Sequence, residues 1–308
     1  MPMNSHSMQN STPSPLKVYS FLILTTFFWG GSFLFNKLGL REIPPIHFVF
    51  IRFSLASILM LALCSTRLKG LNPDIIRRGA IVGAALGMTN LTFVYGVSGT
   101  SISRAGILNN MFVLFIPLVC ALIWRDRVGR ANMAGIALAV AGIGLLASGG
   151  TGFNRGDLIS TVCAVFIAIH IITVSKVLRN DDVYLISLVQ FVTVTFMSGT
   201  AALLTGAPSY SIGATGALSL AYCAIFPTLL CFTLQNSYQR YTTPTRAGLV
   251  YTLDPVWSLL AGFIFLGERL EAREWIGCGL IFMAVLAPLI FRLMLEKRLR
   301  ERISGELN

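Results

Sequence analysis

The chain has 308 residues, of which 55% are hydrophobic and only 12% are charged, and its mean hydropathy is +0.73. Because soluble domains are about one quarter charged, this composition excludes a water-soluble globular protein and an intrinsically disordered chain. The net charge of +11 does not indicate a nucleic-acid partner, because the basic residues are spread over short segments between apolar runs, as in the loops that orient membrane proteins.

Ten apolar segments follow one another along the chain. A helix needs about 20 residues to cross a hydrocarbon core about 30 Å thick. The segments lack the alternation of apolar and polar residues that membrane β-strands show, so we predict an all-α integral membrane protein with ten transmembrane helices. The predicted spans are residues 18–38, 46–65, 79–97, 103–124, 132–147, 157–177, 184–204, 216–237, 245–266 and 275–293.

The two ends of the chain are expected to be tails on the same side of the membrane. Residues 1–17 are polar and lack the basic start and cleavage site of a signal peptide, so we expect a disordered tail. Residues 294–308 mix acidic and basic side chains and form the second tail. Most of the 24 lysines and arginines fall on the side of the tails, so both termini are predicted to be cytoplasmic.

The two halves of the chain are similar to each other. A shift of 142 residues aligns Arg-Ala-Gly at 104–106 with Arg-Ala-Gly at 246–248, and a shift of 139 residues aligns Lys37 with Lys176. Because each half has an odd number of spans, the second half must enter the membrane from the opposite side. We therefore predict two inverted five-helix repeats, with a substrate site near mid-membrane where they meet. The predicted repeats are residues 18–150 and residues 151–293.

Short motifs in both halves match one family of transporters. The first half has Trp-Gly-Gly-Ser at 29–32, followed by Lys37, Pro44 and Arg52. The second half has Gln235, Gln239, Pro244, Ala247, Leu253, Asp254, Pro255, Gly267 and Glu268 in the order of the family's pattern. Over nearly its whole length the chain resembles the drug/metabolite transporter superfamily, specifically the EamA-type permeases of bacteria.

This resemblance implies a permease of the bacterial inner membrane that exports or exchanges small metabolites, amino acids or amphipathic toxic compounds. It implies no cofactor and no ATP site, which agrees with the lack of a glycine-rich phosphate-binding motif. The six cysteines form no C-x-x-C pair and accompany no histidine cluster, so no metal site is predicted. The expected partners are a small-molecule solute, the lipid bilayer and, if transport is coupled, protons.

Asp254 is the most informative polar residue, because it is the only acid in the interior of a predicted span. Pro255 follows it and should kink the helix, and Tyr251 lies on the same face one turn earlier. One interpretation is that this face lines the transport pathway, with Asp254 binding a cationic group or taking up a proton. The other is that a hydroxyl, an arginine or a free backbone group holds Asp254 in the helix packing.

Other polar and aromatic residues at membrane depth are also candidates. His170 suits proton coupling, but it equally suits a hydrogen bond between helices. Amide and phenol groups can line a cavity or join helices, and among them Asn110 and Gln235 are preferred. Trp29 and Trp257 can stack on an aromatic or cationic solute or pack in the core. The remaining candidates are Asn90 and Tyr95, with Asn109 and Asn236 as further buried amides.

Two features are assigned to structure. Arg52, early in the second span, is expected to extend to the interface or to pair with a helix end. Gly83 and Gly87, four residues apart, should permit close contact between helices. Phe112 and Val113 stand where the second half has Asp254 and Pro255, so the role of that pair is not expected to be duplicated.

The predicted function is secondary transport of a small organic solute by alternating access, with an amino acid or related metabolite leaving the cell as the favoured cargo. The alternative cargo is an amphipathic cation or drug. A membrane-embedded enzyme is less favoured, because catalytic motifs are lacking, although His170 and Asp254 would suit an acid–base pair. A receptor or scaffold without transport is not excluded by the sequence.

Overall fold

The computed structural model describes residues 13–100, 102–125, 128–147, 154–206, 209–257, 259–260, 272–273, 275–284 and 291. These residues form helices and turns, without a strand among them. The tails predicted at residues 1–17 and 294–308 lie outside the described residues, apart from residues 13–17, and so do Gly267 and Glu268 of the family pattern.

The described helices follow the predicted spans. They are α1 (Pro15–Gly39), α2 (Pro45–Cys64), η1 (Ser65–Gly70), α3 (Pro73–Gly99), α4 (Ile102–Asn109), α5 (Phe112–Trp124), α6 (Arg130–Ala147), α7 (Arg155–Val177), α8 (Val183–Thr205), α9 (Ala214–Cys223), η2 (Ala224–Leu230), α10 (Cys231–Tyr238), η3 (Gln239–Tyr241) and α11 (Pro244–Tyr251). A further helical segment covers residues 275–284.

Seven helical stretches of the described residues are long and apolar enough to cross a membrane. They correspond to predicted spans one to four and six to eight. The fifth and tenth spans appear as the shorter apolar stretches Asn132–Leu145 and Trp275–Ala284. The ninth begins in α11, and much of its remainder lies outside the described residues. An all-helical membrane protein is therefore confirmed, with seven of the ten predicted spans recognisable at full length in the described part of the chain.

Local sequence explains where the helices begin. Proline occupies the first turn of α1, α2, α3 and α11, where its missing N–H is not needed. Asn72 accepts a hydrogen bond from the N–H of Ile75 at the start of α3. At the start of α7, Asn154 and Asp157 each accept a hydrogen bond from the other's backbone N–H. These caps fix the ends of the spans and hence their register across the bundle.

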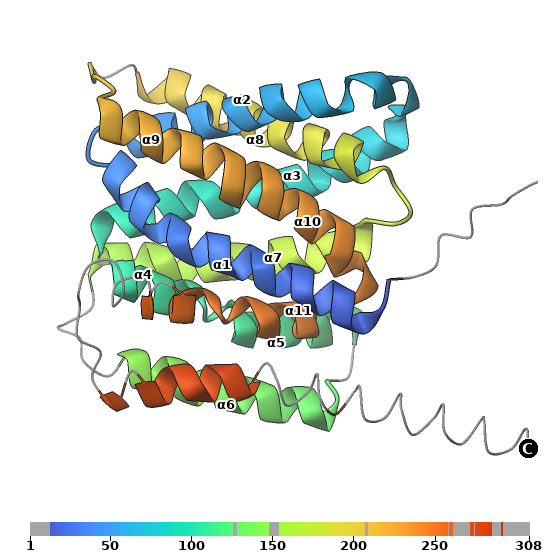
Figure 1. Ribbon diagram of the computed structural model, residues 1–308, viewed down its shortest axis with the longest axis vertical. Helices are drawn as coiled ribbons and strands as arrows, with labels where there is room; N and C mark the ends of the chain where they lie inside the picture. The colour runs from blue at the N-terminus through green and yellow to red at the C-terminus, as the bar shows by residue number, and fades with distance from the viewer. Residues whose placement is uncertain are drawn as a thin grey trace, which may run out of the picture.

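The helices lie side by side as a bundle, with α2 and α8 along one edge and α6 along the opposite edge (Figure 1). Between these edges, α3 packs against α7 and α8, and α1 packs against α9 and α10. Helices α4, α5 and α11 lie between this centre and α6 (Figure 1). The central helices therefore come from both halves of the chain.

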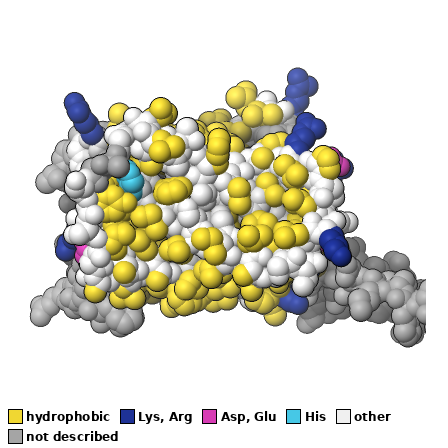
Figure 2. Space-filling model, turned by 90° about the horizontal axis from the view of Figure 1, so that it is seen from above, with side chains coloured by type: hydrophobic (Ala, Val, Ile, Leu, Met, Phe, Trp, Pro, Cys, Tyr) yellow, Lys and Arg dark blue, Asp and Glu magenta, His cyan; other side chains and the backbone are white. Residues whose placement is uncertain are grey.

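The outer face seen from above is largely apolar between two ends that carry basic side chains (Figure 2). Helices α2 and α8 carry large exposed side chains, including Ile58, Leu63, Phe196 and Leu203, which are 60–86% exposed. Such a surface would be unstable in water and matches the hydrocarbon core of a bilayer. The basic side chains at the two ends match the interfacial regions.

Glycines on α3 allow the closest contact between helices, as the sequence predicted for Gly83 and Gly87. A Cβ atom on Gly83 would lie 2.7 Å from the Cβ of Thr193 and 2.8 Å from the carbonyl oxygen of Gln190, both on α8. A Cβ atom on Gly87 would lie 2.7 Å from the sulfur of Met197. The stripe of small residues therefore lets the backbones of α3 and α8 approach each other.

We expect Gly83→Ala to lower the thermal unfolding midpoint of the detergent-purified protein, because the new methyl group meets backbone that cannot move aside, at a cost of about 1–3 kcal/mol. The matched control is Gly144→Ala in α6, where a Cβ would meet nothing within 4 Å. Both changes add the same helix propensity, so the control should hold or raise the midpoint. Equal midpoints for the two variants would contradict the close α3–α8 contact.

Candidate functional site

A cavity lies among the central helices, with about 720 Å³ of space free of protein atoms once its opening to solvent is included. Its walls come from both halves of the chain, the first contributing residues of α1 to α5 and the second residues of α7, α10 and α11 together with Asp254. Seven of the nine residues predicted for the site line it: Trp29, Asn90, Asn110, His170, Gln235, Tyr251 and Asp254. The structure thus brings together residues that are more than 200 positions apart in the sequence.

Two predicted residues lie elsewhere. Tyr95 is 40% exposed on α3 and does not line the cavity. The indole N–H of Trp257 donates to the hydroxyl of Thr26 at 2.8 Å, and its ring packs between Phe27 and Phe282. This packing matches the core role that the sequence left open for Trp257.

The cavity lies beside two broken helices. The helix formed by α4 and α5 is interrupted by a turn at Asn110 and Met111, and α11 ends in a turn at Thr252 and Leu253 before helical structure resumes at Asp254. The two turns are 142 residues apart, which is the shift that aligns the two Arg-Ala-Gly motifs. The helix break is therefore present in both halves, even though the acid and the proline are not.

Side chains stabilise both breaks by bonding to the preceding helical turn. The amide nitrogen of Asn110 donates to the carbonyl oxygen of Gly106 at 2.8 Å. The hydroxyl of Thr252 donates to the carbonyl oxygen of Leu249 at 2.6 Å. The same two carbonyl oxygens also accept from the backbone N–H groups of Asn110 and Thr252, so each side chain adds a second hydrogen bond at its break.

Several polar atoms in the cavity wall are buried and have no hydrogen-bond partner in the described part of the chain. They are Oδ1 of Asp254, Oδ1 of Asn110, Oε1 of Gln235, and both Oδ1 and Nδ2 of Asn109. Four of these five atoms are acceptors. Buried polar groups are normally satisfied, so unpartnered atoms on several residues that line one cavity point to a ligand or water there.

A hydrogen-bond network fixes one part of this wall. Oε1 of Gln239 accepts from Nε2 of Gln235 at 2.8 Å and from the hydroxyl of Tyr251 at 3.0 Å. Nε2 of Gln239 donates to the carbonyl oxygen of Ile171 at 2.6 Å and to the hydroxyl of Ser175. Because Gln235 is held through its nitrogen, its oxygen is the atom left without a partner.

His170 joins helices and lines the cavity at the same time. Its Nε2 lies 3.3 Å from Nε2 of Gln190, and Oε1 of Gln190 accepts from the amide of Asn236 at 2.6 Å. The interhelical role considered from the sequence is therefore present. Within the described residues, the hydrogen-bond partner of His170 is Gln190 rather than Asp254, so the structure offers no bonded acid–base pair between His170 and Asp254.

Arg52 lines the cavity, although the sequence assigned it a structural role. Of the two structural roles expected, it does not extend to the interface, since it is only 3% exposed. It does pair with a helix end, because Cys223 is the last residue of α9. Its Nε donates to the carbonyl oxygen of Cys223 at 3.1 Å and to the hydroxyl of Thr228 at 2.6 Å. Pro227 explains this contact: it has no N–H, so the carbonyl of Cys223, four residues earlier, loses its α-helical donor and η2 adopts the π-helical form.

Aromatic rings form much of the remaining wall, and sequence reasoning missed most of them. The rings other than Trp29 and Tyr251 are Phe33, Phe93, Phe112 and Phe232. Trp29 is held by a hydrogen bond of 3.0 Å from its indole N–H to the carbonyl oxygen of Pro227 and by ring contacts with Phe232 and Tyr251. In spans that are apolar on all faces, nothing in the sequence separates a cavity-facing phenylalanine from one that faces lipid.

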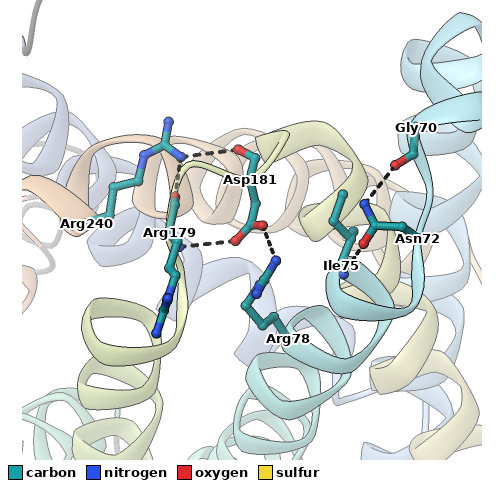
Figure 3. A network of polar contacts seen from close by, with 7 residues as sticks. All are labelled: Gly70, Asn72, Ile75, Arg78, Arg179, Asp181 and Arg240. Carbon is teal, nitrogen blue, oxygen red and sulfur yellow. Dashed lines mark hydrogen bonds and ion pairs between the residues drawn. The ribbon is translucent and has the colours of Figure 1, made fainter.

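Ion pairs and capping contacts join the helices at the end of the bundle where α3 begins (Figure 3). Asp181, in the loop between α7 and α8, pairs with Arg78 of α3 at 2.6 Å and accepts from the N–H of Arg179. Arg240 of η3 donates to the carbonyl oxygens of Arg179 and Asp181. This network ties α3, η3 and the α7–α8 loop together on one side of the cavity.

At the opposite end, a second set of contacts joins α1 to α3 within the first half and the α1–α2 loop to α9 of the second half. The ammonium group of Lys37 donates to the carbonyl oxygens of Val97 and Thr100 at the end of α3. Oε2 of Glu42, in the loop between α1 and α2, accepts from the N–H groups of Gly213 and Gly216 at the start of α9. The cavity thus lies between two ends that are each held by polar contacts.

An all-helical bundle with a lipid-facing apolar surface, broken helices and a central cavity lined by unpartnered polar groups has the architecture of a membrane transporter. The chain belongs to the EamA-like transporter family, whose pattern matches residues 16–148 and again residues 154–289. The resemblance to the drug/metabolite transporter superfamily is confirmed by this match.

Named relatives agree with this class. The chain is 29% identical to an "Uncharacterized transporter" of Archaeoglobus fulgidus over 86% of this chain and 83% of that protein. It is 25% identical to the "Uncharacterized inner membrane transporter YedA" of Escherichia coli, over 88% of this chain and 90% of that protein. A crystal structure of a chain that is 19% identical has the same fold, with a TM-score of 0.75 over 92% of this chain and 100% of that chain.

Proposed function

We propose that the protein is a secondary transporter that moves a small organic solute by alternating access, with the central cavity as the solute site. The observation that carries this proposal is the cavity itself, which lies beside two broken helices and presents unpartnered polar atoms from both halves of the chain. Discontinuous helices beside a cavity at membrane depth are the usual means by which secondary transporters build a solute site.

The mechanism we propose uses ten spans arranged as two inverted repeats, residues 18–150 and 151–293. The equivalent breaks at Asn110–Met111 and Thr252–Leu253 support this arrangement. Packing supports it as well, because α7 packs against α3 as α1 packs against α9 and α10. Exchanging the conformations of two such repeats converts a cavity open to one side into a cavity open to the other side.

We propose a bacterial inner-membrane location with both termini in the cytoplasm. The positions of the basic residues favour this orientation, and the name of the Escherichia coli relative favours this membrane. The network of Arg78, Asp181 and Arg240 then lies at the cytoplasmic end, while Lys37 and Glu42 lie at the outer end.

The cargo we propose is an amino acid or a related metabolite that leaves the cell. The cavity wall combines aromatic rings with a few amides and single ionisable groups, which suits a small solute with both polar and apolar parts. An amphipathic cation remains the alternative, favoured by the excess of unpartnered acceptors. A polyanion would need several basic side chains, and Arg52 is the lysine or arginine among the lining positions described.

Flux measurements with the purified protein in liposomes test this function. We expect labelled amino acids to enter liposomes preloaded with unlabelled amino acid, faster than into protein-free liposomes and without chemical change. Formation of a new product would identify an enzyme instead. If neither amino acids nor amphipathic cations gave any flux or any product, the result would contradict transport altogether.

A further inference from the structure

Gln239 of η3 is fully buried and does not itself line the cavity, yet it contacts two side chains that do. Its oxygen accepts from Gln235 of α10 and from Tyr251 of α11, which are both lining residues. Its nitrogen donates to the backbone of Ile171 and to the hydroxyl of Ser175, both on α7. Gln239 thus links two side chains of the cavity wall to the backbone of a third helix.

The carbonyl oxygen of Ile171 determines which way the Gln239 amide is turned. A backbone carbonyl accepts hydrogen bonds and cannot donate one, and this carbonyl lies 2.6 Å from one end of the amide. That end must be the nitrogen, because two oxygens at this distance would repel each other. The other end is then the oxygen, and it faces the amide of Gln235 at 2.8 Å and the hydroxyl of Tyr251 at 3.0 Å.

The same rule fixes the orientation of Gln235. An amide oxygen can only accept, so the end of Gln235 that meets Gln239 must be its nitrogen. The oxygen of Gln235 is therefore on the other side of its amide, buried and without a partner among the described residues. Because Gln235 lines the cavity, the atom that it offers to a bound solute is an acceptor.

Gln239 is itself held in place. Arg240, the next residue of η3, donates to the carbonyl oxygens of Arg179 and Asp181 in the loop after α7. The hydroxyl of Tyr251 gives the Gln239 oxygen a second donor besides Gln235. Since Gln239 is fully buried, bulk water cannot replace any of these contacts. A buried amide that is bonded at both ends keeps a single orientation.

From these contacts, and resting on the transport function proposed above, we propose that Gln239 is a positioning residue of the solute site. It does not touch the solute. It holds Gln235 so that Oε1 of Gln235 accepts a hydrogen bond from an N–H or O–H group of the bound solute. Without Gln239, the amide of Gln235 is free to rotate and to present either end, so the solute loses a pre-organised contact.

Saturation curves in the liposome assay test this role, with the labelled amino acids of the flux measurement as the probe. Gln239→Met should raise the half-saturating concentration about tenfold, the effect of one lost hydrogen bond, and leave the maximal rate within about twofold of the wild type. Gln235→Met should have the same effect. The double variant should match Gln235→Met alone, because Gln239 acts through Gln235. Increases that add in full would overturn the positioning role.

Asn236→Leu is the matched control. Asn236 is also a fully buried amide, and it joins α10 to Ser187 and Gln190 of α8, neither of which is among the residues that line the cavity. Its replacement should lower the thermal unfolding midpoint without raising the half-saturating concentration. If Gln239→Met behaves in the same way, Gln239 has a structural role alone and the proposal is wrong. Gln239→Asn, one methylene too short to reach α7 and α10 together, takes the place of Gln239→Met if that variant does not fold.

Unfolding midpoints test the contact between the two glutamines without any solute. Gln239→Met leaves both ends of the buried Gln235 amide without a partner among the described residues, so adding Gln235→Met should raise the midpoint again. A double variant less stable than Gln239→Met would show that Gln239 does not hold Gln235. This comparison needs no flux, so failure of the positioning role can be told apart from failure of the transport function.

Discussion

Replacing Asp254 by asparagine is expected to abolish the pH dependence of solute transport while solute exchange remains measurable. In the wild type, a proton and the cationic group of the solute would compete for the same carboxylate, so an inward proton gradient should accelerate export. Asparagine keeps the shape and an acceptor oxygen but cannot take up a proton. The gradient should then have no effect, and exchange should continue at a reduced rate, about tenfold or more below the wild type.

The surroundings of Asp254 determine how this result is interpreted. Tyr251 of α11, Arg52 of α2 and His170 of α7 line the same cavity. Among these, His170 is the other side chain whose ordinary chemistry includes taking up a proton. His170→Gln is therefore the control, and it should retain the response to the gradient. If transport by Asp254→Asn still responded to the proton gradient, Asp254 would have no part in coupling. If only His170→Gln lost the response, the coupling role would belong to His170.

More of the fold than of the site could be predicted from the sequence. Spans are set by length and hydropathy, because a bilayer demands about 20 apolar residues whatever their order. The helix break at Asn110 and Met111 could not be predicted from local sequence, since Phe112 and Val113 lack the proline found at 255. Repeat symmetry is the signal that would have found it, because the shift of 142 residues places Asn110 on Thr252.

The cavity wall depends on which way each side chain faces. Polar residues at membrane depth were a useful guide, since burial in lipid is costly and seven of the nine candidates line the cavity. Tyr95 shows the limit of that guide, because a phenol can also lie at an exposed position. The position of Arg52 depends on a π-helical turn around Pro227, in a helix from the other half of the chain, which spacing along the sequence does not reveal.

Asn109→Leu is expected to raise the thermal unfolding midpoint and to lower the transport rate. Both polar atoms of the Asn109 amide are buried, and neither has a partner among the described residues. Leucine, which has the same branching and the same number of side-chain heavy atoms, removes this cost. The cost is about 1–3 kcal/mol for an unsatisfied buried group and corresponds to about 2–4 °C per kcal/mol. It also removes a donor and an acceptor from the cavity wall, so transport should fall about tenfold or more.

The matched control is Asn36→Leu, because Asn36 is equally buried but is hydrogen-bonded. Its amide nitrogen donates to the carbonyl oxygen of Ser32 at 2.7 Å, and its oxygen accepts from Arg52. Leucine there should lower the midpoint, since it leaves a donor of Arg52 without a partner. A higher unfolding midpoint for Asn109→Leu and a lower one for Asn36→Leu, with transport lost in Asn109→Leu, would show that Asn109 serves solute binding at the expense of stability. A lower midpoint for both would mean that Asn109 has a structural partner, and the cavity would then lose one of its polar contacts.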